Sequence, residues 1–102
     1  MEVLVLIDTP SKLLKEIKQS CKTYLEQEGF GQVDGEDFAY LGKTNTSLIQ
    51  TRAYILATFQ KVPSLLGVKD FKILFQIGDN AFEAYAFEEP SKEFKKLEKP
   101  KK

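Results

Sequence analysis

Residues 71–88 read FKILFQIGDNAFEAYAFE and carry the stronger of two hairpin signals in the chain. Its first half alternates large apolar residues with other side chains, at the period of two that is typical of a β-strand. The segment Gly78-Asp79-Asn80 then separates it from a second β-capable run over residues 81–88. Glycine and asparagine favour tight turns, so the sequence predicts a β-hairpin here.

A second, weaker hairpin is predicted upstream. The dipeptide Asp34-Gly35 separates residues 30–33 from residues 36–41, and both flanking segments are β-capable. Asp-Gly favours hairpin turns because both central residues must adopt positive φ. Residues 42–47 are polar and are expected to form a loop.

The N-terminal segment predicts a strand followed by a helix. Residues 3–7, VLVLI, form a continuous apolar run that suits a buried strand. Thr9 can cap a helix whose first residue is Pro10. Apolar residues then recur at helical spacing as far as Gly29, which suits the C-terminal end. We expect one long amphipathic helix over residues 10–28.

Residues 48–62 are compatible with two structures. Large and small apolar residues alternate over residues 52–59, and their aromatic and β-branched content favours a strand. However, Ser47 and Gln50 match a capping box, and apolar residues from Leu48 to Phe59 share one helical face. We favour the strand, with a short helical turn at residues 63–67 and another from Pro90-Ser91 through residue 97.

The two hairpins coincide when the chain is shifted by 45 residues, which aligns Ala39-Tyr40 with Ala84-Tyr85. With strand 3–7 matched to strand 52–59, each half reads strand, helix, hairpin. We therefore predict an α+β fold in which two similar β-α-β-β units form a mainly antiparallel sheet system. The single domain would span residues 1–98, with halves 1–46 and 47–89 and a flexible lysine-rich tail at 99–102. Chance identity is the alternative explanation of the repeat.

Composition excludes several classes of site. Histidine is absent and Cys21 is the only cysteine, so Cys–His and Ser–His nucleophilic pairs and most zinc sites are excluded. Basic and acidic residues number 15 each, and Arg52 is the sole arginine, which disfavours strong binding to nucleic acid. No stretch is long and apolar enough for a membrane helix, and we expect a cytoplasmic protein without a cofactor.

Two residues could carry chemistry, but a structural role is favoured for both. Asp8 follows the first strand, a position that often holds a metal-binding or nucleophilic carboxylate, yet it needs partners such as Asp34, Asp37 or Asp79. Cys21 lies on the apolar face of the first helix, where a buried, inert thiol is expected. We therefore predict no catalytic residue, no metal ligand and no enzymatic activity.

The second hairpin is rich in aromatic rings, which can stack on bases. Its basic frame is thin and Glu83, Glu88 and Glu89 lie beside the rings, so a nucleic-acid-associated module is the alternative hypothesis. The tyrosines suggest a protein interface instead, because their side chains combine an apolar body with a polar tip. Tyr40, Tyr54 and Tyr85 are the candidate partner-binding residues.

The turns Asp34-Gly35 and Gly78-Asp79-Asn80, with Ala39-Tyr40 and Ala84-Tyr85 beside them, resemble a small protein of filamentous archaeal viruses. This resemblance implies a duplicated β-α-β-β architecture in a protein of the host cytoplasm. It implies no enzymatic activity, carries over no functional residues and favours an interaction role. Our first hypothesis is a non-enzymatic module that binds a peptide segment by strand addition in a groove between the two halves. Its oligomeric state is left open.

Overall fold

The computed structural model describes residues 1–67, 71–88 and 93–97. Along the chain the elements are β1 (Glu2–Asp8), α1 (Ser11–Ser20), α2 (Lys22–Gln27), β2 (Gly31–Gln32), β3 (Ala39–Lys43), α3 (Leu48–Leu66), β4 (Lys72–Ile77), β5 (Glu83–Glu88) and β6 (Glu93–Lys96). The strands form a single sheet, so the α+β class and the antiparallel sheet predicted from the sequence are confirmed.

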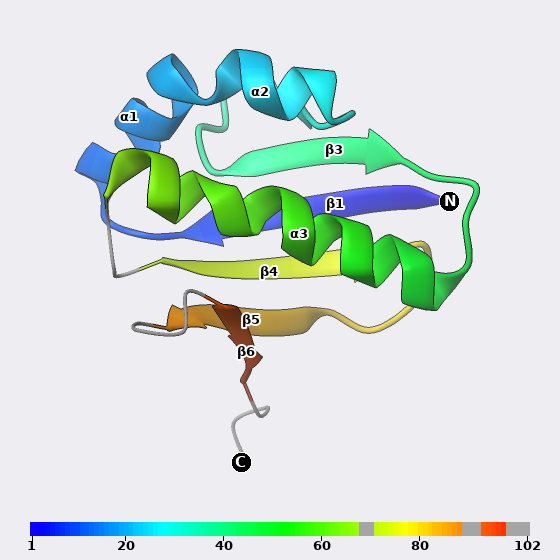
Figure 1. The fold of residues 1–102 in the computed structure, drawn as a ribbon. Helices are drawn as coiled ribbons and strands as arrows, with labels where there is room; N and C mark the ends of the chain where they lie inside the picture. Colours follow the sequence, from blue (N-terminus) through cyan, green and yellow to red (C-terminus); the bar gives the residue numbers. More distant parts are fainter. Residues whose placement is uncertain (68–70, 89–92, 98–102) are drawn as a thin grey trace.

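The sheet has the order β2-β3-β1-β4-β5-β6, and every neighbouring pair is antiparallel. β1 lies between β3 and β4, and residues 3–7 form the strand that the apolar run predicts. β3 and β4 are therefore parallel to each other, and α3 connects them by crossing over the sheet (Figure 1).

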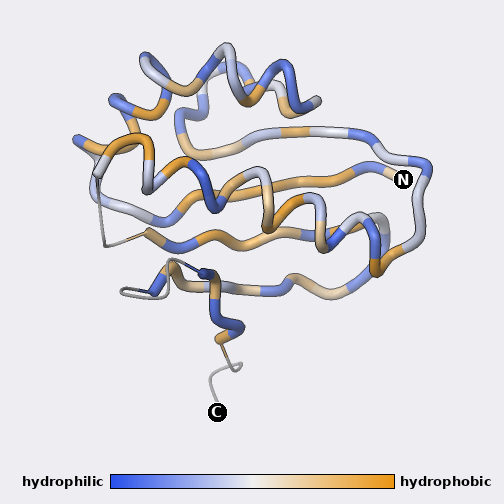
Figure 2. Tube along the Cα trace, viewed as in Figure 1, coloured by the Kyte–Doolittle hydropathy of each residue, from blue (hydrophilic) through white to orange (hydrophobic). Residues whose placement is uncertain are grey.

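One face of the sheet carries the helices and the core. Val3, Val5 and Ile7 of β1 are at most 3% exposed and belong to one buried cluster with Ile17 of α1 and Phe59 of α3. Leu25 of α2 joins the same cluster. Helices and sheet thus form two layers, and Figure 2 shows the apolar positions concentrated along the central strands.

Residues 52–59 are helical, so the favoured strand prediction is wrong and the helical alternative is confirmed. The capping box forms: the Ser47 hydroxyl accepts from the Gln50 N–H, and the Gln50 side chain accepts from the Ser47 N–H. The buried residues of α3 recur at helical spacing, at Thr51, Ile55, Thr58, Phe59 and Val62. The alternation of apolar residues over 52–59 is misleading, because the apolar residues of this segment that are not buried lie on the outer side of the helix.

α3 is also longer than either prediction required. The turn expected at residues 63–67 is the end of this helix, with Pro63 inside its last turns. Gly67 ends it in the left-handed conformation, at φ 67°. The one long helix therefore lies in the second half of the chain.

The helix predicted over residues 10–28 is split in two at Cys21, which has φ −112° and ψ 0°. Hydrogen bonds continue across the break, since the Cys21 N–H donates to Ile17 O and the Leu25 N–H donates to Cys21 O. The break reorients α2, whose Tyr24 hydroxyl donates to Thr58 O of α3 at 2.9 Å. The helix begins at Ser11, with Pro10 at the N-cap position, one residue later than predicted.

Both predicted hairpins form, β2–β3 with Gly35 at φ 79° and β4–β5 with Gly78 at φ 57°, but with longer connections than predicted. The strand expected at residues 36–41 is Ala39–Lys43, which extends into the expected loop, and β5 begins at Glu83 rather than at residue 81. The helical turn expected near residue 94 is wrong, because Glu93–Lys96 pairs with β5 as a strand. This pairing packs Phe94 against the Phe87 ring, with centroids 5.9 Å apart. Pro90-Ser91 and the tail 99–102 lie outside the described residues.

The predicted duplication is not confirmed. Strand 3–7 was matched to a strand at 52–59, and that segment is the middle of α3. The described part of residues 47–89 therefore reads helix, strand, strand, without the initial strand that a β-α-β-β unit needs. What the fold retains of the repeat is the placement of strands, because β2 and β3 shifted by 45 residues fall on the end of β4 and on β5.

Candidate interaction surface

The second face of the sheet is also apolar, although no helix of the described residues packs on it. Side chains alternate between faces along a strand, so β1 presents Leu4 and Leu6 opposite to its three core residues. Strand pairing places Leu41 beside Leu4, and Leu74 beside Leu6. We call this surface the open face; Gln76 of β4 lies on it beside Leu4, and its apolar members are Leu4, Leu6, Ala39, Leu41, Leu74, Phe82, Ala84 and Leu97.

One apolar row crosses the open face from strand to strand. Leu6 pairs with Ala39 on one side and with Leu74 on the other, and Leu74 in turn pairs with Ala84. The row continues to Leu97, whose N–H donates to Ala84 O at 2.8 Å. Antiparallel sheets with one solvated face usually carry polar residues there, so this row is unusual for a surface left to water.

The most exposed members of the open face lie beside this row or at its end. Leu41 is 50% exposed, Phe82 40% and Leu97 37%, whereas Leu6 and Leu74 are half-buried by their neighbours. Contiguous exposed apolar patches above a few hundred Å² mark sites of interaction. The members of the open face are neighbours in the sheet rather than scattered residues, as in such a patch.

Charged residues border the open face at both ends of the central strands. Glu2 of β1 pairs with Lys43 of β3 at one end, and Asp8 of β1 pairs with Lys72 of β4 at the other. All four are exposed. An apolar centre with a polar rim is the usual arrangement of a protein interface.

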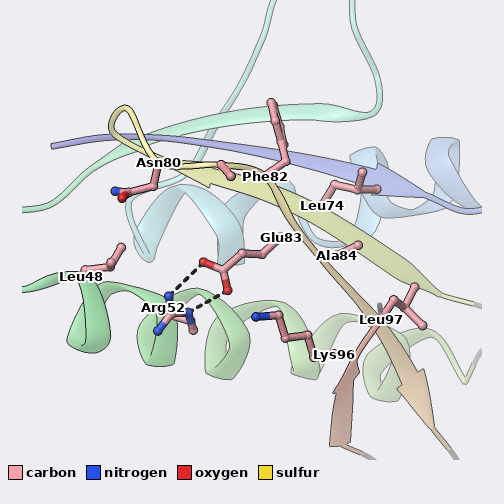
Figure 3. Close-up of a pocket in the computed structure, with 10 residues that line it drawn as sticks. Leu48, Arg52, Leu74, Asn80, Phe82, Glu83, Ala84, Lys96 and Leu97 are labelled. Carbon is pink, nitrogen blue, oxygen red and sulfur yellow. Dashed lines mark hydrogen bonds and ion pairs between the residues drawn. The ribbon is translucent and has the colours of Figure 1, made fainter. Parts of the chain in front are cut away.

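A hollow of about 470 Å³ adjoins the open face where β5 begins. Leu74 and Phe82 line it from the open face and point away from α3, whereas Glu83 points towards α3 (Figure 3). Leu48 and Lys96 complete its helix side. The hollow therefore connects the open face with the edge of the helical layer.

An ion pair forms the polar wall of this hollow. Arg52 Nε donates to Glu83 Oε1 at 2.8 Å, and Arg52 Nη2 donates to Glu83 Oε2 at 3.0 Å. The Tyr85 hydroxyl donates to the same carboxylate at 3.1 Å. Burial acts to raise the pKa of Glu83, but hydrogen bonds from Arg52 and Tyr85 and the nearby charges of Arg52 and Lys96 lower it overall. The pair ties α3 to β5 and holds one geometry.

The three tyrosines chosen from the sequence do not come together on a surface. Tyr40 of β3 is 2% exposed and Tyr85 of β5 is 7% exposed; both belong to the core on the covered face. Tyr54, on α3, is 40% exposed, and its hydroxyl donates to the main-chain and side-chain oxygens of Glu28. Two strands, β1 and β4, separate Tyr40 from Tyr85.

The aromatic hairpin is mostly core as well. Phe71, Phe75, Tyr85 and Phe87 are at most 7% exposed, and Phe75 stacks on Tyr85 with centroids 5.4 Å apart. Phe82 is the ring of this hairpin that solvent reaches. Stacking of several bases requires several exposed rings, so this geometry does not support the nucleic-acid hypothesis.

Cys21 and Asp8 lie at the positions that the sequence predicts, inside the core and at the end of the first strand. Cys21 is fully buried, and burial raises the pKa of its thiol. Asp8 is exposed at the end of β1, beside Lys72. Within residues 1–67, 71–88 and 93–97, no three acidic or cysteine side chains gather closely enough to hold a metal ion.

Sequence reasoning missed the open face, although a signal was present. Val3–Ile7 is apolar at every position, and Leu74 lies between apolar neighbours in β4. A strand that buries one face should alternate with polar residues, whereas a continuous apolar run indicates that both faces are covered. The run was correctly interpreted as a buried strand, but what covers its second face was not considered.

No family model, curated protein or solved structure matches this chain. The resemblance to a filamentous-virus protein therefore stays a prediction. None of the helices in the described part of the chain is both long and apolar enough to cross a bilayer. Assignment of a function rests on the geometry above.

Proposed function

We propose that this chain is a non-enzymatic protein-interaction module whose binding surface is the open face of the sheet. The observation that carries the proposal is the apolar row of Leu6, Leu74 and Ala84, which lies opposite to the helical layer and is half-buried; Ala39, at its end, is 5% exposed. Burying such a row in a partner removes apolar surface from water at about 25 cal/mol per Å². The row therefore supplies a driving force for association.

The binding mode differs from strand addition in a groove between two halves. Main-chain pairing requires an unpaired strand edge, whereas the open face presents side chains from strands that are already paired on both sides. Leu6 and Leu74 lie on β1 and β4, the two central strands of the sheet. Side-chain packing against a partner's apolar surface is the contact that these residues favour.

The proposal is tested by affinity capture with matched variants. Purified wild-type protein, Leu74→Lys and Leu65→Lys are immobilised and incubated with lysate of the cells that naturally produce the chain. Leu65 is 63% exposed on the outer side of α3, so its substitution adds the same charge away from the open face. Retained proteins are identified by mass spectrometry.

We expect the wild type and Leu65→Lys to retain the same proteins and Leu74→Lys to lose them. The reason is that a lysine in the centre of an apolar contact must be buried without a partner. Equal retention by all three proteins would disprove the assignment of the open face. Nuclease treatment that removed the retained proteins would favour association through nucleic acid instead.

A further inference from the structure

We propose that the partner of the open face is a second copy of this chain, so that two sheets pack face to face in a homodimer. This inference rests on the proposed function, since it names the occupant of the same surface. Its basis is the similarity of the residues on the two sides of one line of the open face. This line runs parallel to the strands, between β1 and β4. A twofold axis along that line, midway between two stacked sheets, places β1 of each copy over β4 of the other.

The central apolar row is symmetric about this line, whereas Leu4 pairs with the polar Gln76 across it. Leu6 and Leu74 are cross-strand partners on either side of it, and the next strands outward present Ala39 and Ala84. The twofold axis thus stacks Leu6 on Leu74 of the second copy, and Ala39 on Ala84 of the second copy. Side chains of matching size meet at the same height, which suits the spacing of about 10 Å between packed sheets.

The charges on the rim select the same axis. Asp8 and Lys72 are cross-strand partners across the line, so the twofold axis brings Asp8 of each copy over Lys72 of the other. The two copies therefore gain two pairs of opposite charge. An in-plane axis perpendicular to the strands would instead place Glu2 over Asp8 of the second copy, and like charges would repel.

The area of the sheet sets the size of the contact. Its six strands contain 30 residues in all, and at about 4.8 Å between strands and about 3.3 Å per residue they project onto roughly 480 Å². Accessible surface exceeds this flat projection because side chains corrugate the face. The contact therefore lies at the small end of stable interfaces, whose standard size is ~800 Å² per partner.

The first test is sedimentation equilibrium of the purified full chain over a range of concentrations. We expect the wild type to sediment at twice its mass of 11.6 kDa. Leu74→Lys and the more exposed Leu41→Lys should each weaken dimerisation about tenfold or more, because each adds a charge to the buried contact. Leu65→Lys, on the outer side of α3, should dimerise as the wild type does. Circular dichroism verifies that each variant is folded.

The second test exchanges the charges at the axis. The Asp8→Lys chain carries two positive charges beside the line, and the Lys72→Asp chain carries two negative charges. Each variant alone should dimerise more weakly than the wild type, because like charges then face each other. An equal mixture should form a heterodimer more tightly than either variant associates with itself.

The outcomes separate this inference from the proposed function. A wild-type chain that stays monomeric up to about 1 mM overturns the homodimer, as does a dimer insensitive to both Leu74→Lys and Leu41→Lys. If such a monomer still captured another protein through Leu74, the open face would keep its proposed function with a different partner. A leucine-dependent dimer without preference in the mixing experiment would overturn the proposed axis.

Discussion

The two faces of this sheet are built from the same strands and residue types, yet one is covered and the other is not. In β4, Ile73 is fully buried beneath the helices, whereas its neighbour Leu74 is half-buried on the open face. In β1, Val5 and Leu6 differ in the same way. Apolar character alone therefore does not distinguish a residue that holds the fold together from one available for binding. The position of the helices decides it.

This comparison predicts that equal truncations on the two faces have unequal effects. Ile73→Ala should lower the free energy of unfolding by about 2–5 kcal/mol, because it leaves a cavity in a close-packed core. Leu74→Ala should cost roughly 1 kcal/mol or less, since its side chain already contacts water. Urea unfolding of dilute protein measures both values without a contribution from self-association.

Similar decreases in the free energy of unfolding for Ile73→Ala and Leu74→Ala would contradict this difference between the two faces. Such a result would mean that the open face is packed within the single chain, for instance by residues outside the described segments.

Much of the fold could be predicted from local sequence signals. The alternation in residues 71–77 and the turn at Gly78 define the β4–β5 hairpin, because both depend on residues close in the chain. α3 shows the limit of such reasoning. Its capping box at Ser47 predicts a helix, whereas its aromatic and β-branched residues predict a strand. In the folded chain the helix is the more stable of the two, because it buries one apolar face against the sheet.

The binding surface could not be predicted in the same way, because it depends on tertiary structure. Tyr40 and Tyr85 were chosen as amphipathic interface residues, and the sheet directs both towards the helices. That the Leu74 side chain points away from the helices can be deduced only from the strands beside β4 and from the face of the sheet that the helices cover. A periodicity of two defines two faces without stating which one is covered.

Two glycines sharpen the contrast between the faces. Gly42 of β3 pairs with Val3 on the covered face, and a Cβ there would lie 2.9 Å from Gly29 O and 3.0 Å from the Phe30 ring. Gly31 of β2 pairs with Leu41, on the open face, and its Cβ would meet nothing within 4 Å. Close approach of two backbone segments therefore requires glycine at position 42.

We expect Gly42→Ala to destabilise the protein by about 1–3 kcal/mol, because the segment at Gly29 must shift to admit the methyl group. Gly31→Ala should leave stability unchanged or raise it by a few tenths of a kcal/mol, because alanine restricts the unfolded chain. Thermal unfolding followed by circular dichroism measures both. A loss at position 31 as large as that at position 42 would contradict the open space assigned to β2.

The two charged pairs provide a smaller test. Arg52 and Glu83 form a two-point ion pair on the helix side, with their side chains 31% and 12% exposed. Asp8 and Lys72 are exposed partners on the open face. Arg52→Met should lower the free energy of unfolding by about 1–2 kcal/mol at pH 7, whereas Lys72→Met should change it by less than about 0.5 kcal/mol in dilute protein.

The effect of Arg52→Met should depend on pH in one direction. The pKa of Glu83 is lower in the folded chain than its ordinary value of 4.5, so the ion pair contributes fully above that value. Its contribution is lost as the pH falls through the lower folded value, where Glu83 becomes protonated. The difference between wild type and variant should therefore shrink below pH 4.5, and a constant difference down to pH 2 would contradict the ion pair as its cause.

The smallest expected effect concerns two tyrosines of the covered face. The Tyr40 hydroxyl is buried without a hydrogen-bond partner in the described structure, whereas the Tyr85 hydroxyl donates to Glu83. Removing an unsatisfied buried group should stabilise, so Tyr40→Phe should raise the free energy of unfolding by up to about 1 kcal/mol. Tyr85→Phe should lower it by a similar amount, since it removes a hydrogen bond to a charged group.

Alkaline pH separates this explanation from a simple packing effect. Burial, with smaller contributions from the charges of Cys21 and Asp37, raises the pKa of Tyr40 to about 12, from an ordinary value of 10.0. The folded chain therefore retains a proton that the unfolded chain has lost, and this contribution to stability disappears as the pH rises from about 10 towards 12. Tyr40→Phe has no phenol to titrate at this position and does not lose this stability. The difference in free energy of unfolding between Tyr40→Phe and the wild type should therefore grow above pH 10. An advantage independent of pH would show that the Tyr40 phenol is not buried as the fold places it.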